Sequence, residues 1–153
     1  GFQNELLQNL GTLRVSRVSR YAEHSEWKPI YGERGSYPGS FRGVLVQLVP
    51  RGGTLPVLEL NIRAYDAGLA WRIQFPQGGV ANQLRIDAET TTYSMPQGTM
   101  AWATYKAQAE YQRVPVEEIK DGCERPLTLE FPDGSFAALA EAGMDDFARM
   151  KFA

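Results

Sequence analysis

The amino-acid sequence predicts an all-β sandwich, and three observations point to this fold class. Apolar and polar residues alternate with a period of two in several segments, which is the pattern of a strand with one covered face. Fifteen glycines and nine prolines supply turns along the 153 residues. No segment shows the repeat of a long amphipathic helix. Because a chain of this length usually forms one core, we expect a single domain over residues 1–153.

The N-terminal part of the chain predicts one strand followed by a long loop. In residues 12–20, Leu13 and Val15 alternate with polar neighbours, which indicates a strand with one solvated face. Residues 24–41 are aromatic, polar and rich in Gly and Pro, so they predict an ordered loop instead of a regular element. Loops of this size in compact domains are often functional.

The central part predicts three successive antiparallel strands. Residues 43–49 are a continuous apolar run, which ends in turn chemistry at Pro50-Arg51-Gly52-Gly53. Residues 58–65 and 69–75 both alternate with a period of two around a short Asp-Ala-Gly turn. Trp71 falls on the apolar side of the last strand, so we expect it in the core.

The pattern weakens between the third strand and the C-terminal region. Residues 84–93 predict a strand that runs to Tyr93, because Leu84 and Ile86 begin the alternation and three threonines favour an extended backbone. Residues 95–111 have no clean period and predict a strand interrupted by loops. Residues 115–122 predict one helical turn that ends in a glycine cap.

The C-terminal region gives the strongest local prediction, a β-hairpin. Two apolar segments, residues 127–131 and 136–140, flank an Asp-Gly turn at residues 132–135. Three carboxylates follow the second segment within six residues: Glu141, Asp145 and Asp146. Strand ends are places where functional sites are commonly built.

Composition argues against several classes of function. The net charge is −2 and no run of Lys or Arg could neutralise successive phosphates, so we expect no nucleic-acid partner. Arg14, Arg17 and Arg20 indicate a solvated strand face. No segment has the apolar length of a membrane span. The single cysteine, Cys123, excludes an intrachain disulfide and is expected to be structural.

Nucleophile and cofactor motifs are missing, so the remaining chemistry rests on carboxylates. The lone histidine, His24, is more simply explained as a solvated side chain than as a catalytic base. Paired carboxylates suit either glycoside hydrolysis or Ca²⁺ ligation. Asp145 and Asp146 are more simply explained as part of a solvated turn after a strand. Glu141 follows an apolar strand and is flanked by small residues, so its charge needs a partner or a metal, and it is the best candidate.

Several segments, in the same order, resemble the N-terminal domain of glycoside hydrolase family 97. Trp27–Glu33 (WKPIYGE) and Ile62–Pro76 (IRAYDAGLAWRIQFP) look like two characteristic segments of that family. Ala109–Ile119 (AEYQRVPVEEI) and Pro126–Phe152 (PLTLEFPDGSFAALAEAGMDDFARMKF) resemble its C-terminal hairpin region. The resemblance therefore covers most of the chain.

The resemblance implies a β-supersandwich of the galactose-mutarotase type that packs against a catalytic (β/α)₈ barrel. In the family the barrel carries the catalytic residues, so the resemblance implies that this chain alone is inactive. It also implies a periplasmic or secreted α-glucosidase or α-galactosidase that acts on an α-linked oligosaccharide. Glu141 matches the glutamate that joins barrel glutamates around Ca²⁺. Residues expected near the sugar or the barrel are Trp27, Tyr31, Glu33 and Trp102.

The chain departs from the family pattern at both ends. Compared with the family, it is expected to stop where a linker to the barrel would begin and to have incomplete first strands before Trp27. Unpaired strand edges favour self-association, so a homo-oligomer is a further expectation. The alternative function is a stand-alone carbohydrate-binding or interaction sandwich whose exposed aromatic residues stack on sugar rings.

Overall fold

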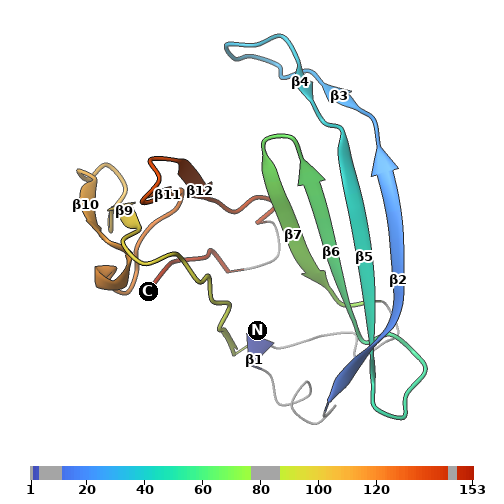
Figure 1. Cartoon of the computed structure of the whole chain (residues 1–153). Coiled ribbons are helices and arrows are strands. Elements are labelled where there is room, and N and C mark those ends of the chain that lie inside the picture. The colour runs from blue at the N-terminus through green and yellow to red at the C-terminus, as the bar shows by residue number, and fades with distance from the viewer. Residues whose placement is uncertain (1, 4–11, 77–86, 145–147) are drawn as a thin grey trace. The chain divides into compact units, whose positions relative to one another are not determined.

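The computed structural model describes residues 2–3, 12–76, 87–144 and 148–153. The regular secondary structure of the described residues is almost entirely antiparallel strand, which confirms the predicted all-β class (Figure 1). The chain forms two compact units, residues 1–91 and 92–153, and each is described by itself. The prediction of one domain over residues 1–153 remains a prediction. Among the described residues, no helix is long and apolar enough to cross a membrane.

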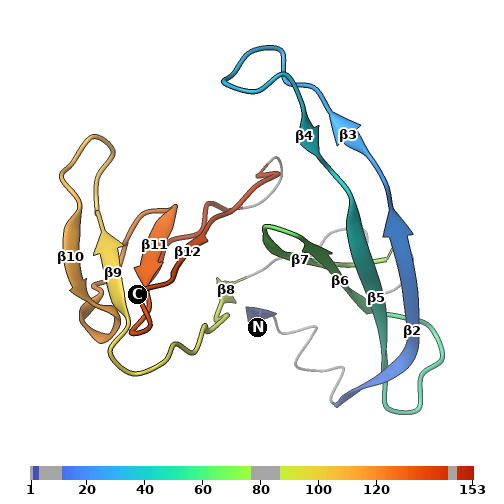
Figure 2. The same ribbon diagram turned by 45° about the horizontal axis from the view of Figure 1, so that its top comes forward.

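The first unit contains a four-stranded antiparallel sheet in the order β2-β5-β6-β7 (Figure 2). The strands span Leu13–Glu23 (β2), Phe41–Pro50 (β5), Leu58–Tyr65 (β6) and Gly68–Gln74 (β7). These bounds confirm the predicted strands at 12–20, 43–49, 58–65 and 69–75. The alternation in the sequence was sufficient here because consecutive strands pair with each other.

The pairing of β2 with β5 contains one irregularity, at Ser16. Val15 pairs with Leu48 and Arg17 pairs with Gln47, so Ser16 has no partner in the register. The Ser16 hydroxyl donates instead to the carbonyl of Gln47, at 3.1 Å. This extra residue is a β-bulge, and it keeps both Val15 and Val18 on one face although they are three positions apart.

The two faces of this sheet differ in polarity. On the polar face, Tyr21 donates to Asn61 Oδ1 at 2.6 Å and Gln47 donates to a Glu59 carboxylate oxygen at 2.7 Å. The same face is crossed by Arg63, whose guanidinium lies 4.4 Å from the centre of the Phe41 ring. The opposite face carries the aliphatic rows of the paired strands, which include Val44, Val46, Leu48, Leu58, Leu60 and Ile62.

Trp71 lies on the apolar face as its alternation predicts, opposite Ile62 in the register, but its predicted burial is wrong. Its residue surface is 37% exposed and that of its neighbour Leu69 is 67% exposed. The physical reason is that β7 is an edge strand of the sheet. Alternation identifies the face that a side chain occupies but does not supply a layer to cover it.

The segment predicted as a long loop extends the β2–β5 pair beyond the main sheet. It contains two short strands, Glu26–Trp27 (β3) and Tyr37–Pro38 (β4), in which Trp27 pairs with Tyr37. Residues 28–36 close the extension as an irregular loop, seen at its far end in Figure 1. The loop prediction is therefore confirmed, apart from the short ladder at its base.

The predicted strand through the threonine run is largely wrong. In the part of this segment that the structure describes, residues 87–93, only Ala88–Glu89 (β8) forms a ladder, paired with Phe2–Gln3 (β1). Residues 90–93 have no regular secondary structure, while Leu84 and Ile86 lie outside the described residues. β-branched residues favour extended φ and ψ angles, but a strand also needs a partner for its backbone groups.

The second unit contains a four-stranded antiparallel sheet in the order β10-β9-β11-β12. The strands span Met100–Ala103 (β9), Gln112–Pro115 (β10), Leu127–Glu130 (β11) and Phe136–Leu139 (β12). The prediction of an interrupted strand within 95–111 is confirmed by β9. One face of the sheet forms a core of five buried residues: Ala101, Ala103, Cys123, Leu127 and Leu129.

The segment between β10 and β11 confirms the predicted helical turn but not its cap. Val116–Glu118 form a 3₁₀ helix (η1) that ends at Ile119, and Gly122 belongs to a later turn. Cys123, next to Gly122, is fully buried and carries a free thiol. Cys123 and Phe152 exchange two backbone hydrogen bonds, which tie the C-terminal residues to this core.

The predicted β11–β12 hairpin and its Asp-Gly turn are confirmed. The amide of Gly134 donates to the carbonyl of Phe131, and Gly134 has a φ of +82°, which glycine adopts without strain. The Asp133 carboxylate accepts hydrogen bonds from both the amide and the hydroxyl of Ser135. This is a tight turn with a glycine bulge, and it fixes the register in which Leu127 faces Leu139.

Candidate functional site at the end of the C-terminal hairpin

Glu141, the predicted metal ligand, forms an ion pair with Arg125. Arg125 lies two residues before β11 and Glu141 lies two residues after β12. Because the antiparallel register places Leu127 opposite Leu139, the hairpin brings these two side chains together. Arg125 Nε and Glu141 Oε2 are 2.9 Å apart, and the side chains are only 10% and 19% exposed. The charge of Glu141 is therefore compensated within this chain.

The C-terminal segment completes the surroundings of this ion pair. The amide of Met150 donates to Glu141 Oε2 at 2.9 Å, and Arg125 Nη1 donates to the carbonyl of Met150 at 3.2 Å. Arg125 Nη2 also contacts the Sδ atom of Met144. One guanidinium therefore orients the Glu141 carboxylate and holds the backbone that bonds to it.

Glu141 and Arg125 line an open groove with a volume of about 470 Å³. Its other lining residues come from the β9–β10 connection, from both outer ends of the β11–β12 hairpin and from the C-terminal segment: Thr104, Lys106, Ala107, Gln108, Ala109, Tyr111, Glu124, Pro126, Ala140 and Arg149. Gln108 has a φ of +63°, which is uncommon for a residue with a side chain. The groove therefore combines charged side chains with an aromatic ring and an irregular loop.

A second carboxylate in the groove, Glu124, is also paired. It forms ion pairs with Arg149 and with Lys151, whose Nζ lies 3.0 Å from Glu124 Oε1. The hydrogen bond from Lys151 is the main reason that the pKa of Glu124 is lowered, and the charge of Arg149 adds to the effect. Glu124 thus stays ionised in the folded chain.

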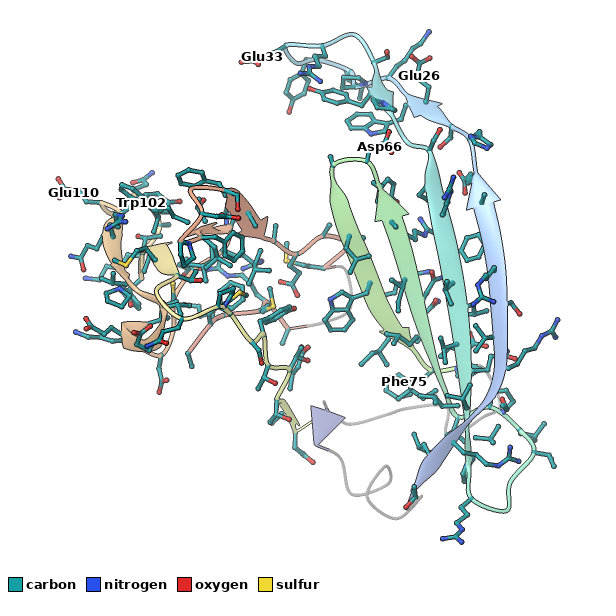
Figure 3. The ribbon with its side chains drawn as sticks, viewed as in Figure 1. Glu26, Glu33, Asp66, Phe75, Trp102 and Glu110 are labelled. Carbon is teal, nitrogen blue, oxygen red and sulfur yellow. The ribbon has the colours of Figure 1, made fainter. Side chains whose placement is uncertain are left out.

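Trp102 lies on the sheet face opposite the buried core. Its strand neighbours Ala101 and Ala103 are fully buried, whereas Trp102 is 37% exposed (Figure 3). In the register it stands between Arg113 on β10 and Thr128 on β11. The structure therefore places Trp102 and Glu141 in the same unit.

An ion pair accompanies Trp102 on this face. Arg113 Nε and Nη2 donate to the two carboxylate oxygens of Glu130, at 2.9 and 3.0 Å. These hydrogen bonds are the main reason that the pKa of Glu130 is lowered. The two parallel contacts fix the orientation of both charged groups.

The other predicted substrate residues, Trp27, Tyr31 and Glu33, belong to the hairpin extension of the first unit. Trp27 stacks on Tyr37 with ring centres 5.1 Å apart and planes inclined by 20°. Tyr31 is 89% exposed, and Glu33 lies at the outer end of the extension in Figure 3. All three residues therefore belong to the hairpin extension, and of them Trp27 is the one that packs against another ring.

The described residues do not form a calcium site by themselves. They contain no group of three or more His, Cys, Asp or Glu side chains that could hold a metal ion. Calcium takes six to eight oxygen ligands, whereas Glu141 Oε2 is engaged by a cation and a backbone amide. The predicted neighbours Asp145 and Asp146 lie outside the described residues. The prediction that Glu141 ligates calcium therefore remains a prediction.

Sequence reasoning missed Arg125, Arg113 and Glu130. Both ion pairs join residues that are 16 or 17 positions apart, and local periodicity contains no information about such contacts. The predicted hairpin could have identified Arg125. In an antiparallel hairpin the residue numbers of every opposed pair add up to the same value, which Leu127 and Leu139 fix. By this rule residue 125 lies opposite residue 141.

Comparison with protein families gives one match along the whole chain. The family described as Glycosyl-hydrolase 97 N-terminal matches residues 1–153. No curated protein matches the chain.

Solved structures of a Glycoside Hydrolase Family 97 enzyme from Pseudoalteromonas sp. strain K8 share the fold. The TM-score is 0.78 for its complex with acarbose, 0.77 for a glutamate-to-glutamine variant with panose and 0.76 for an arginine-to-lysine variant. Each is 22% identical over 90% of this chain. The chain spans only 22% of the length of each of these structures.

Proposed function

Because the chain belongs to the glycosyl-hydrolase 97 N-terminal family, we propose that it is the non-catalytic N-terminal domain of a calcium-dependent α-glycosidase. The parent activity is of the α-glucosidase or α-galactosidase type, and the substrate is an α-linked oligosaccharide. In this role the chain supports a catalytic barrel and contributes Glu141 and rim residues to its active site. A periplasmic or secreted location and a homo-oligomeric state belong to the same proposal.

The single observation that carries this proposal is the fixed carboxylate of Glu141 at the wall of a groove. Arg125 and the amide of Met150 both engage Oε2, so the carboxylate is oriented before any partner arrives. It is nevertheless 19% exposed, which leaves it within reach of a group that enters the groove. A preorganised carboxylate of this kind is suited to complete a site that another domain provides.

We propose that the calcium site is assembled from residues of two domains. The ion, when bound, would supply positive charge beside the scissile bond. This chain contributes one oriented carboxylate, and Arg125 holds that carboxylate in place without the metal. The remaining ligands are assigned to the barrel, so we expect the isolated chain to bind Ca²⁺ weakly or not at all.

The hairpin extension supports the proposed rim role. Ile30 is fully exposed, Tyr31 is 89% exposed and Trp27 is 56% exposed. Exposed aromatic side chains on a loop favour contact with a partner or with a sugar ring. Glu33 adds a hydrogen-bonding group at the end of the same loop.

A first experiment tests whether catalysis resides in this chain. The isolated 153-residue chain is assayed on p-nitrophenyl α-glucoside and α-galactoside with and without Ca²⁺. We expect no turnover, because the proposal assigns the catalytic residues to the barrel. Turnover that disappears in Glu141→Gln would show that the catalytic site lies within the chain.

A second experiment tests the accessory role directly. Residues 1–153 replace the matching region of the Pseudoalteromonas enzyme, and hydrolysis by the chimera is measured against Ca²⁺ concentration. We expect activity in the chimera, a loss of at least tenfold for Glu141→Gln, and little change for the exposed control Glu118→Gln. Equal activity of the two variants would contradict a role for Glu141.

The alternative, a stand-alone carbohydrate-binding or interaction sandwich, is favoured by the exposed aromatic residues of both units. It predicts that the isolated chain binds an oligosaccharide while a folded chimera remains inactive. The accessory role predicts an active chimera, whether or not the isolated chain also binds sugar.

A further inference from the structure

The C-terminal segment, residues 148–153, runs past Cys123 in the antiparallel direction. Cys123 and Phe152 form an antiparallel bridge, in which each amide donates to the carbonyl of the other residue at 3.0 and 2.9 Å. The same order continues two positions along, because Arg125 Nη1 donates to the carbonyl of Met150 at 3.2 Å. The place of Met150 therefore depends on how this segment is held.

Glu124 binds the residues on both sides of Met150. The side chain of Glu124 is only 12% exposed, and it forms ion pairs with Arg149 and with Lys151, whose Nζ lies 3.0 Å from Oε1. Arg149 and Lys151 are the chain neighbours of Met150. One shielded carboxylate therefore holds the two residues that flank the amide bonded to Glu141.

Glu124 is itself fixed to the core of the second unit. Its amide donates to the carbonyl of Thr104 at 2.8 Å, and both Thr104 and the neighbouring Cys123 are buried. The hydrogen bond from Lys151 is the main cause that lowers the pKa of Glu124, so its carboxylate is ionised at neutral pH. Glu124 thus offers a charged group on a backbone that is held in place.

Both donors to Glu141 engage the same carboxylate oxygen. Arg125 Nε and the Met150 amide each lie 2.9 Å from Oε2, so neither of them occupies Oε1. A glutamate carboxylate turns easily about its last side-chain bond, because that torsion has broad minima. Without the amide, the guanidinium alone could pair with either oxygen. The Met150 amide therefore decides which oxygen faces away from the pair.

We infer that Glu124 is a positioning residue for Glu141, and that it acts through the C-terminal segment by fixing the Met150 amide on Glu141 Oε2. The inference rests on the proposed function, in which the orientation of the Glu141 carboxylate matters for a site completed by another domain. Outer contacts that orient a metal-binding carboxylate affect metal affinity although they do not touch the ion.

Amide hydrogen exchange in the isolated chain, followed by NMR, tests the first step. Glu124→Gln is expected to raise the exchange rate of the Met150 amide about tenfold relative to the Leu129 amide in the core of β11. Glu130→Gln is the matched control, because it also removes a carboxylate of the second unit that is paired with an arginine, Arg113. This control should leave the ratio of the two exchange rates unchanged.

A second variant covers the case in which Glu124→Gln does not fold. Lys151→Met changes a side chain that is 45% exposed and leaves Glu124 with Arg149 alone. It is expected to raise the relative exchange rate of the Met150 amide about threefold. The inference is overturned if this rate is unchanged in Lys151→Met, or if it rises no more in Glu124→Gln than in Glu130→Gln.

The second step is measured in the chimera with the Pseudoalteromonas enzyme. Glu124→Gln is expected to raise the Ca²⁺ concentration at half-maximal activity about threefold or more, with hydrolysis at saturating Ca²⁺ nearly unchanged. Glu130→Gln should change neither quantity. Equal shifts in the two variants, or a loss of hydrolysis at saturating Ca²⁺ without a shift, would contradict a positioning role. An inactive unsubstituted chimera would count against the proposed function instead, and the exchange rates of the isolated chain would still decide the inference.

Discussion

Arg125 and Glu141 form an ion pair with Nε and Oε2 2.9 Å apart, and both side chains are largely shielded from water. The pair joins the two outer ends of one hairpin, and the backbone of Met150 bonds to both of its members. This arrangement gives the C-terminal segment a fixed place beside the groove. Arg125 therefore stabilises the fold and, in the proposed function, also positions the carboxylate of Glu141.

Removal of Arg125 is expected to destabilise the chain more than removal of an exposed arginine. Arg125→Met leaves a shielded carboxylate without its partner and should lower the free energy of unfolding by about 2–3 kcal/mol. Urea denaturation measures the change. Arg113→Met is the control and should cost less, because the side chain of Arg113 is 44% exposed. An equal loss in the two variants would show that burial of the Arg125 pair has no special effect.

The pH dependence of stability should include a contribution from Glu130. Its pKa in the folded chain lies below the ordinary value of 4.5, chiefly because of Arg113. The pair therefore stabilises the folded chain above that value, and this contribution is lost as the pH falls through the lower pKa.

Urea midpoints between neutral and strongly acidic pH provide the measurement for this prediction. Glu130→Gln should flatten part of the decline below about pH 4.5. A Glu130→Gln profile parallel to that of the original chain would contradict the prediction.

Gly43 is required by the packing of Tyr21. A Cβ atom at Gly43 would lie 2.3 Å from Tyr21 Cζ, so the ring would have to move. Its movement would disturb the 2.6 Å hydrogen bond to Asn61 and the edge contact with Phe41. Gly43→Ala should therefore lower the free energy of unfolding by about 1–3 kcal/mol.

Urea denaturation of Gly43→Ala is compared with that of Gly35→Ala, where a Cβ meets no atom within 4 Å. Combining Gly43→Ala with Tyr21→Ala should remove most of the extra cost, because the clash disappears with the ring. Additive costs in the double variant would argue against this explanation.

Cys123 is expected to be unreactive in the folded chain. Burial raises the pKa of its thiol, and the residue is fully enclosed by the core of the second unit. Its reaction with a chromogenic disulfide reagent should be slow under native conditions and fast in denaturing urea. Rapid modification of the native chain would show that this core opens readily.

Much of the first sheet could be predicted from the sequence. Apolar and polar residues alternate along β6 and β7, and the two faces of the sheet do differ in polarity. The threonine run lacked that information: its residues favour an extended backbone, but residues 90–93 are not part of a ladder. Trp71 shows a related limit, since its face was predicted correctly and its exposure was not.

The candidate site was only partly predictable. The position of Glu141 after an apolar strand indicated that its charge needs compensation, and Arg125 supplies it. The identity of that partner depends on the register of the hairpin. Arg113 and Glu130 come from non-consecutive strands, so their pairing depends on the order β10-β9-β11.

Because Ser16 has no partner in the register, β2 could lose one residue at this position without disturbing its pairing with β5. Ten of the eleven residues of β2 are matched with β5, and in most strands losing a residue turns every later side chain to the opposite face. Ser16 is the unmatched residue, so a β2 shortened there would return to regular alternation. Leu13 and Val15 would remain in phase with Val18, and the sheet would keep its polar and apolar sides.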